Sequence, residues 1–337
     1  MPGIVRLVQL DGTLPSLPLM LLSSFHKARG DEVVFTRSPY RQMDEPAYDA
    51  VYGSAIFDYS ADRVARLAAE FPGAIIGGTG SGKENGKRQV EHIVGGHRDL
   101  DYSLYPDFEA SIGFSQRGCR FKCAFCVVPG KEGAPVATGS IADIWRGPGH
   151  KKWIHLLDND VFGQPKPAWK ARLRELREGD FRVCFNQGIN IRVVTDEIAE
   201  ELATVQYRDD GFKVRRLYTA WDNIGDEALF FRGVDRLERA GIPARHLMAY
   251  MLVGFDPDET WERIHHRFDR MVERGIRPYP MVYDRRRLDL KQFQRWAARG
   301  LYRAVPWSEY DPGAKARNKP GPGQQAFDFS GSMPDAA

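Results

Sequence analysis

The hydrophobic positions in the first part of the chain alternate between short runs and longer stretches with helical spacing. Apolar runs rich in β-branched residues predict strands, whereas apolar residues that recur every three to four positions predict helices. The expected strands are residues 4–9, 32–36, 50–55 and 74–76. The expected helices between them are residues 17–29 and 61–71. This order is typical of a small parallel sheet with helices on its faces, so we predict a Rossmann-like α/β domain over residues 1–105.

A second series of strand and helix patterns begins near residue 111. Six strands are expected, at residues 111–115, 153–157, 182–186, 216–221, 247–253 and 280–283. The helical patterns between them are at residues 141–145, 168–178, 196–205, 226–240 and 260–274. Repeated β/α units of this kind close into a full or partial barrel, whose chemistry lies at the carboxyl ends of the strands. We therefore predict a partial (β/α)6 barrel over residues 106–305, followed by a disordered tail over residues 306–337.

The composition indicates a folded protein without a membrane span. Hydrophobic residues make up 42% and charged residues 28% of the 337 residues, which is enough to form a core. The longest apolar run near the start, residues 17–22, is far shorter than the ~20 residues that cross a bilayer. We see no signal-peptide pattern before the first strand, so we expect a cytoplasmic protein. In such a chain, clustered cysteines indicate metal binding or catalysis rather than disulfides.

Positive charge is concentrated near the end of the second series. Residues 263–303 contain twelve Lys or Arg and four Asp or Glu, whereas the whole chain has a net charge of +3. The aromatic residues of this stretch are Phe268, Tyr279, Tyr283, Phe293, Trp296 and Tyr302. Basic stretches with aromatic residues are typical of surfaces that bind a polyanion or stacked bases. The other interpretation is that these residues form the solvated faces of two amphipathic helices.

Three cysteines form the motif with the clearest chemistry. Cys119, Cys123 and Cys126 directly follow the first strand of the second series, where a strand-to-helix loop is expected. Three thiolates on one short loop can hold three corners of a 4Fe–4S cluster and leave the fourth iron open. A structural zinc site needs four ligands, and the remaining cysteine, Cys184, lies far along the chain on an expected strand. We interpret Cys184 as a buried residue that packs like a small apolar side chain.

The spacing Cys-x3-Cys-x2-Cys, with Phe125 just before the last cysteine, resembles the signature of the radical S-adenosylmethionine superfamily. The resemblance covers residues 111–283. It implies that the open iron binds S-adenosylmethionine, and that reduction yields methionine and a 5'-deoxyadenosyl radical, which abstracts hydrogen from a substrate. It also implies an electron donor of the flavodoxin or ferredoxin type. The substrate is not identified, and the basic stretch leaves an anionic or nucleotide-like molecule open.

The same resemblance assigns residues at later strand ends to S-adenosylmethionine. Where the family often has Gly-Gly-Glu, residues 158–160 read Asp-Asn-Asp, and carboxylates suit a cationic amine. Turn formation is the other interpretation of these three residues. The amide of Gln187 suits ribose hydroxyls, and Arg192 suits the methionine carboxylate. Asp222 ends the fourth strand, and Gly254 follows the fifth, where the family's backbone contacts adenine. The complete set of expected contacts is Phe125, Asp158, Asn159, Asp160, Gln187, Arg192, Asp222 and Gly254.

The predicted N-terminal domain resembles the cobalamin-binding domain that precedes many barrels of this superfamily. Gly77-Gly78, after an apolar strand, matches the loop that approaches the nucleotide tail of the corrinoid. The usual lower-ligand motif contains a histidine after the first strand, but this chain has Asp11-Gly12-Thr13 at that place. Both cobalamin binding and a domain that no longer binds a cofactor are therefore open.

The resulting hypothesis is a radical S-adenosylmethionine enzyme with an unidentified substrate. One alternative is a cobalamin-dependent methyltransferase of the same superfamily. A second alternative is a radical enzyme that modifies a nucleotide or nucleic acid, because of the basic stretch. A third, from another class, is a non-catalytic binding protein stabilised by an iron–sulfur cluster or zinc.

Overall fold

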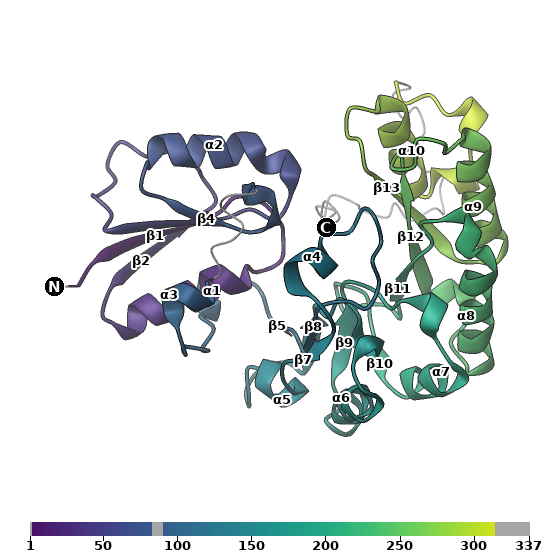
Figure 1. The fold of residues 1–337 in the computed structure, drawn as a ribbon, viewed down its shortest axis with the longest axis horizontal. Helices are drawn as coiled ribbons and strands as arrows, with labels where there is room; N and C mark the ends of the chain where they lie inside the picture. Colours follow the sequence, from purple (N-terminus) through teal and green to yellow (C-terminus); the bar gives the residue numbers. More distant parts are fainter. Residues whose placement is uncertain (1, 83–89, 314–337) are drawn as a thin grey trace, which may run out of the picture. The chain divides into compact units, whose positions relative to one another are not determined.

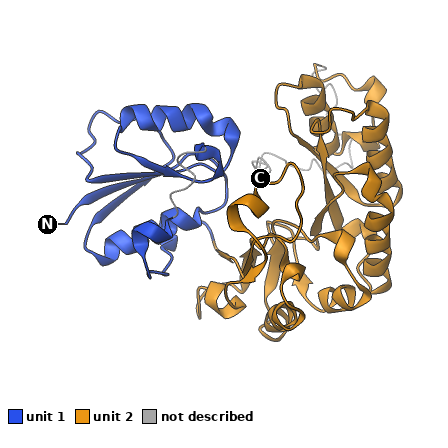
Figure 2. Ribbon diagram, in the orientation of Figure 1, with its two compact units in different colours: residues 1–108, 325–337 blue, residues 109–324 orange. Residues whose placement is uncertain are grey.

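The computed structural model describes residues 2–82 and 90–313, and over these residues the chain is an α/β protein with several parallel sheets (Figure 1). The chain divides into two compact units, residues 1–108 and 109–324 (Figure 2). The sequence analysis places this division after residue 105. Within the described residues, no helix combines the length and the apolar character that crossing a bilayer requires.

Unit 1 is built on a parallel sheet with the strand order β2-β1-β3-β4. Its elements are β1 (Ile4–Gln9), α1 (Leu17–Ala28), β2 (Glu32–Thr36), β3 (Ala50–Ser54), α2 (Ala61–Glu70), β4 (Ile75–Gly77) and α3 (Glu91–Val94). Successive side chains of a strand point to opposite faces, so Leu7 packs into one apolar cluster and Val8 into another. Figure 1 shows α2 over one face of the sheet and α1 and α3 over the other. The Rossmann-like arrangement predicted for this part of the chain is confirmed.

Unit 2 contains two parallel sheets, with the orders β10-β9-β8-β5 and β11-β12-β13, and a small antiparallel pair, β6-β7. Its strands are β5 (Ser111–Gly113), β6 (Gln116–Arg117), β7 (Val136–Ala137), β8 (Trp153–Leu156), β9 (Arg182–Phe185), β10 (Gln206–Tyr207), β11 (Leu217–Ala220), β12 (Leu247–Val253) and β13 (Arg277–Val282). Its helices are α4 (Val128–Glu132), α5 (Ile141–Ile144), α6 (Lys166–Glu178), α7 (Asp196–Ala203), α8 (Glu227–Arg239), α9 (Trp261–Glu273) and α10 (Leu288–Ala298). The six expected strands are present. The hydrogen bonds between these strands form two separate sheets, so the structure does not show the single barrel sheet that was predicted.

The burial of β12 explains why its sheet needs helices on one side. Leu247, Ala249, Met251 and Val253 alternate along the strand and are 0% exposed. They belong to one continuous apolar core that also contains Phe268 of α9. The intervening residues of β12 point to the opposite face and are half-buried. The sheet therefore packs against helices on one face and is partly open on the other.

Some elements differ from the sequence-based expectation. β13 begins at Arg277 rather than at residue 280, and it contains Pro278 and Pro280. Proline cannot donate a ladder hydrogen bond and is tolerated in an edge strand, which is the position of β13 in its sheet. The pair β6-β7 and helix α4 surround the cysteines where only a loop and turn were expected. Proline in the first turn of α4 is compatible with a helix, because the first backbone N–H groups need no intrahelical acceptor.

The expectation that a disordered tail begins at residue 306 is wrong for its first residues. A short 3-10 helix, η10 (Trp307–Glu309), follows α10. The ring of Trp307 stacks on Trp261, with 5.6 Å between the centroids, and meets Phe293 edge-on at 5.3 Å. Because large aromatic rings bury much apolar area, this contact attaches the segment to the core of unit 2. The rest of the predicted tail, residues 314–337, lies outside the described residues.

Candidate functional site

The three cysteines lie on one loop between β6 and α4, which we call the cysteine loop (residues 118–127). All three thiols are free and half-buried. The backbone N–H of Cys126 donates to the carbonyl of Cys123 at 2.9 Å, and that of Cys119 donates to the carbonyl of Gly133 at 3.0 Å. These bonds fold the loop back toward the end of α4. The expectation that the cysteines share one short loop after the first strand of the series is confirmed.

Gly118 fixes the entry into the cysteine loop. Its φ is +79°, and an added Cβ would lie 2.3 Å from the carbonyl oxygen of Ala134. Its backbone N–H donates to the carboxylate of Glu132 at 3.1 Å. Glu132 also pairs with Arg117, at 2.9 Å. Burial acts to raise the pKa of Glu132, but the hydrogen bonds from Arg117 and Gly118 hold this pKa below its usual value. Only glycine fits this position, so the start of the loop is tied to the end of α4.

Asp158 connects the end of β8 to the turn that precedes the cysteine loop. Its carboxylate accepts hydrogen bonds from the backbone N–H groups of Ser115, at 2.7 Å, and Gln116, at 3.0 Å, and from the Ser115 hydroxyl. The residue is 3% exposed. Burial raises the pKa of Asp158 to about 6, although the hydrogen bonds oppose this. Asp158 therefore supports the backbone from which the cysteine loop begins.

Asn159 and Asp160 contact the cysteine loop and its flanks. The guanidinium of Arg120 donates two hydrogen bonds to the carboxylate of Asp160, at 2.7 and 3.0 Å, and this carboxylate is nearly fully buried. The side-chain amide of Asn159 donates to Glu132 at 2.8 Å. The backbone N–H of Asp160 donates to the side chain of Gln116 at 2.9 Å. The residues that the sequence assigned to S-adenosylmethionine thus have partners within the protein.

Arg192 and Phe125 bring other strand ends to the cysteine loop. Arg192 lies after β9 in the 3-10 helix η6 (Ile191–Val193), and its Nη2 is 3.9 Å from the Sγ of Cys123. The same guanidinium pairs with Asp226 at 2.9 Å. The ring of Phe125 meets Phe255, which follows β12, edge-on at 5.5 Å. Residues that are far apart in the sequence therefore converge on the cysteines.

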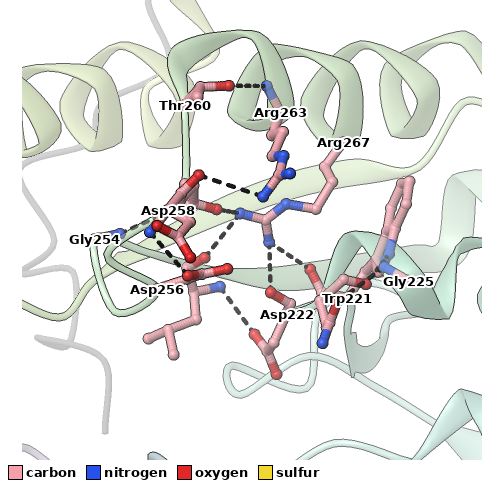
Figure 3. Close-up of polar contacts among 12 residues, drawn as sticks. Trp221, Asp222, Gly225, Gly254, Asp256, Asp258, Thr260, Arg263 and Arg267 are labelled. Atoms are coloured by element: carbon pink, nitrogen blue, oxygen red, sulfur yellow. Dashed lines mark hydrogen bonds and ion pairs between the residues drawn. The ribbon is translucent and has the colours of Figure 1, made fainter.

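Arg267 holds together the ends of β11 and β12 (Figure 3). It projects from α9, is 1% exposed, and forms an ion pair with Glu259. Its guanidinium also donates to three backbone carbonyls, at 2.9 to 3.0 Å, those of Trp221, Asp222 and Leu252. Because a buried guanidinium is costly to leave without acceptors, this set of contacts fixes both strand ends.

The Arg267 network positions Asp222 and Gly254. The carboxylate of Asp222 accepts the backbone N–H of Leu252 at 2.9 Å, and that of Glu259 accepts the backbone N–H of Gly254 at 2.9 Å. Burial raises the pKa of Asp222. Gly254 has a φ of +77°, and an added Cβ would lie 2.6 Å from a side-chain carbon of Leu290. Asp222, after β11, and Gly254, after β12, are therefore held in defined positions.

The cysteines affect one another electrostatically. Burial raises the pKa of the Cys119 and Cys126 thiols, and the neighbouring cysteines raise it further. Asp222 and Glu132 add to the effect on Cys126. A bound cation reverses such shifts, because thiolates are the form that binds metal.

The donor set fits a cluster better than a single ion. Among the described residues, no group of three or more His, Cys, Asp or Glu side chains is arranged to hold one metal ion. Structural zinc requires four ligands around one atom. In a 4Fe–4S cluster, by contrast, each thiolate binds a different iron, so three free thiols on one loop suit this group.

Two further residues of interest lie on β9 or at its end. The side chain of Gln187 is exposed on the turn after the strand. Cys184 is 0% exposed, and burial raises the pKa of its thiol well above the usual value. The expectation that Cys184 is a buried packing residue is confirmed.

The basic stretch over residues 263–303 is largely used within unit 2. Phe268, Phe293 and Trp296 are 1%, 0% and 4% exposed, so these rings are not available to stack on bases. Arg286 and Arg287 form ion pairs with the neighbouring Asp284 and Asp289. The three rings therefore pack in the core of unit 2, and binding of a polyanion by the charged residues of the stretch stays a prediction.

In unit 1, residues that resembled a corrinoid site have internal roles. Gly78 has a φ of +102°, and an added Cβ would lie 2.0 Å from the carbonyl oxygen of Ala55. At Gly80 the distance to the carbonyl oxygen of Phe57 would be 2.2 Å. The carboxylate of Asp11 accepts the backbone N–H of Phe57 at 3.0 Å. Close backbone packing therefore accounts for these glycines, and cobalamin binding stays a prediction.

Arg267 and Arg120 were not identified from the sequence. Arg267 occupies a position in the apolar stripe of α9, beside Ile264, Phe268 and Met271, and a charged residue within such a stripe is a signal of a buried network. Arg120 carries no such signal, because its partner Asp160 comes close only through the fold.

Comparison of the chain with protein-family models, with curated proteins and with solved structures finds no match.

Proposed function

We propose that this protein is a radical S-adenosylmethionine enzyme in which Cys119, Cys123 and Cys126 bind a 4Fe–4S cluster. The observation that carries the proposal is the cysteine loop, in which three free, half-buried thiols lie beside an arginine and a carboxylate from other strand ends. When bound, the cluster supplies the electron that cleaves S-adenosylmethionine to methionine and a 5'-deoxyadenosyl radical.

The residues around the loop have distinct parts in this proposal. Arg192 places a guanidinium beside Cys123, where its remaining donors suit the carboxylate of the methionine moiety. Asp222, near Cys126, supplies a carboxylate for the amino group. Phe125 contacts Phe255, the residue after Gly254, and we assign the backbone of Gly254 to adenine. Gln187 offers an exposed amide for ribose hydroxyls.

Asp158, Asn159 and Asp160 act as supports of the loop rather than as ligands. Their side chains hold the turn before the loop, the end of α4 and Arg120, respectively. By fixing the backbone between β6 and α4, they keep the three thiols at one end of the parallel strands. This assignment replaces the direct contact with the ammonium group that the family resemblance implied.

The finer architecture that we propose is a partial barrel formed by β5, β8, β9, β11, β12 and β13. A backbone hydrogen bond of 2.8 Å from Ile189, after β9, to Tyr218 of β11 supports it, because this bond links the two parallel sheets. In such a barrel the carboxyl ends of all six strands would face the same space, and the cysteine loop and its neighbours follow several of these ends.

The test is the formation of 5'-deoxyadenosine by the full chain, reconstituted with iron and sulfide under anaerobic conditions, reduced with dithionite and supplied with S-adenosylmethionine. We expect product from the wild type and from Cys184→Ala, and none from Cys123→Ala. Cys184→Ala is the matched control, because it removes a cysteine that lies away from the loop. Product formation by Cys123→Ala would overturn the proposal, and a bound cluster without product in the wild type would favour the non-catalytic alternative.

A further inference from the structure

The amino ends of the unit 2 strands carry a concentration of arginines. Arg182 is the first residue of β9, Arg216 directly precedes β11, Arg245 lies just before β12, and Arg277 begins β13. Parallel strands of one sheet begin at the same edge, which is opposite to the edge where the cysteine loop lies. We call the following set the arginine edge: Arg182, Arg208, Arg215, Arg216, Arg245, Arg277 and Arg303.

The arginines of this edge have no carboxylate partners. In the part of the chain that the structure describes, none of them forms an ion pair, and Arg208, Arg216 and Arg277 donate to backbone carbonyls instead. Other arginines on the surface of unit 2 do have partners, as in the pairs of Arg239 with Asp196 and of Arg274 with Asp235 and Glu238. Other exposed arginines of unit 2, such as Arg232 and Arg295, also form no ion pair with a described residue, so the edge is defined by the gathering of its arginines near the starts of neighbouring strands.

The segments that carry the arginine edge contain fewer carboxylates than arginines. These carboxylates form hydrogen bonds or ion pairs. Asp180 accepts from Gln206, Asp209 accepts from the backbone of the loop before β11, Asp210 accepts from Gly211, and Glu238 pairs with Arg274. They leave an excess of positive charge at the edge.

Some of the positive charges lie close together, and two of them, Arg215 and Arg245, line a hollow. Burial lowers the pKa of Arg208, and the nearby Arg182 and Arg215 lower it further. A hollow of about 380 Å³ lies within the edge, lined by Arg215, Glu238, Gly241, Pro243, Arg245 and His246. The Nδ1 of His246 is 2.7 Å from the hydroxyl of Tyr207, which joins the start of β12 to β10. Like charges that are held together without partners repel one another in the free protein, so an anionic ligand would relieve this repulsion.

The composition of the edge favours phosphate groups along a chain over other anions. The guanidinium fork matches phosphate geometry, and arginines outnumber the lysines of the same segments, which are Lys151, Lys152 and Lys213. The starts of β11, β12 and β13 alone span two strand spacings of ~4.8 Å, which exceeds the size of one phosphate. Among the described segments that form the edge, Val214 is the one exposed large apolar side chain. A protein partner normally requires an apolar centre in its interface, whereas nucleic-acid backbones are bound mainly by charged groups.

We propose that the arginine edge binds the phosphate backbone of a nucleic acid. This surface is distinct from the cysteine loop, and binding to it requires no cluster, so the inference does not depend on the proposed function. It shares Arg277 and Arg303 with the basic stretch over residues 263–303, whereas its other five arginines lie outside that stretch. Arg286 and Arg287 of the stretch are ion-paired and do not belong to the edge.

The test is fluorescence anisotropy of a short, labelled single-stranded RNA of mixed sequence, titrated with the full chain between about 50 and 200 mM salt. We expect the wild type to bind, and its affinity to fall as salt rises. The double variant Arg215→Gln/Arg245→Gln should bind at least about tenfold more weakly at low salt. Its slope of log affinity against log salt should be shallower by about 1.4, since each phosphate contact on a single strand contributes about 0.7.

The matched control is Arg286→Gln/Arg287→Gln, which removes the same charge from ion-paired, exposed positions. It should change the affinity less than about twofold, because both positions lie outside the arginine edge and each arginine has a carboxylate beside it that offsets its charge. Circular dichroism melting establishes that each variant is folded. If the double variant is unstable, Arg182→Gln, at another exposed point of the edge, provides the same comparison.

Three results would overturn the proposal: no RNA binding by the wild type at low salt, an equal loss of affinity in the control, or displacement of RNA by polyglutamate as readily as by unlabelled RNA. The last result would assign the surface to an acidic protein. Formation of 5'-deoxyadenosine without substrate should be unchanged in Arg215→Gln/Arg245→Gln. Failure of the RNA proposal can therefore be distinguished from failure of the radical chemistry.

Discussion

Replacement of Arg267 by methionine tests whether the buried network at the ends of β11 and β12 stabilises unit 2. Methionine has a similar length but no charge and no donor. The change leaves the carboxylate of Glu259, whose side chain is 9% exposed, without its counter-charge. It also removes the donor from the three backbone carbonyls that Arg267 contacts.

The magnitude follows from the burial of the pair. Removal of one partner of a buried ion pair costs about 3–5 kcal/mol, because the other charge remains buried and uncompensated. With a shift of roughly 2–4 °C for each kcal/mol in a unit of this size, the melting temperature should fall by roughly 6–20 °C. The matched control is Arg270→Met on the same helix, where the side chain is 47% exposed and pairs with Glu227. An exposed pair contributes about 0–1 kcal/mol, so this variant should melt close to the wild type.

Tryptophan fluorescence is the appropriate assay, because all seven tryptophans of the chain lie in unit 2. The double variant Arg267→Met/Glu259→Gln should recover a substantial part of the loss, since it removes both buried charges. If Arg267→Met melts within about 2 °C of Arg270→Met, the reasoning about the network is wrong.

Three further predictions concern the cysteine loop and its surroundings. Gly118→Ala should reduce the iron content after reconstitution to a minor fraction of the wild-type value, because an added Cβ would lie 2.3 Å from a backbone oxygen. Gly130→Ala, whose added Cβ would meet no atom within 4 Å, should retain iron, and equal iron contents would contradict the prediction. Burial raises the pKa of Asp158 to about 6, so the folded chain binds this proton more tightly than the unfolded chain. The free energy of unfolding should therefore decrease by up to roughly 3 kcal/mol as the pH rises from about 4 to about 6. The variant Asp158→Asn should lack this decrease. Parallel pH profiles of the wild type and the variant would refute the assignment. Arg192→Gln should weaken S-adenosylmethionine binding by roughly tenfold or more in calorimetry of the reconstituted protein, with unchanged iron content. Arg177→Gln, in an exposed pair with Glu201, should bind as the wild type does, and an equal effect in both variants would speak against a direct contact.

The order of strands and helices could be predicted because each element buries one face. In β12 every second residue from Leu247 to Val253 is fully buried, and such alternation is visible in the sequence. The start of β13 was missed because Pro278 looks like a strand breaker, and the position of β13 at the sheet edge permits it. The packing of Trp307 was missed because a single aromatic residue in a polar segment gives no periodic pattern.

The cysteine loop could be predicted because its ligands are close in sequence, whereas its supports are not. Asp158 and Ser115 are 43 positions apart, and the spacing of acidic residues does not indicate which backbone groups a carboxylate will bind. The three-residue run at 158–160 therefore resembled a ligand motif, although the structure gives each side chain a partner within the protein. The register of β5 and β8, which places these groups together, is set by long-range packing that single-sequence patterns do not contain.

The central claim is that three thiols bind a cluster and leave one iron open to S-adenosylmethionine. Electron paramagnetic resonance of the reconstituted, reduced full chain, before and after addition of S-adenosylmethionine, tests this most directly. We expect the signal of a reduced 4Fe–4S cluster that changes when S-adenosylmethionine is added and is absent in Cys123→Ala but present in Cys184→Ala. No cluster signal, or a signal that S-adenosylmethionine leaves unchanged, would contradict the account.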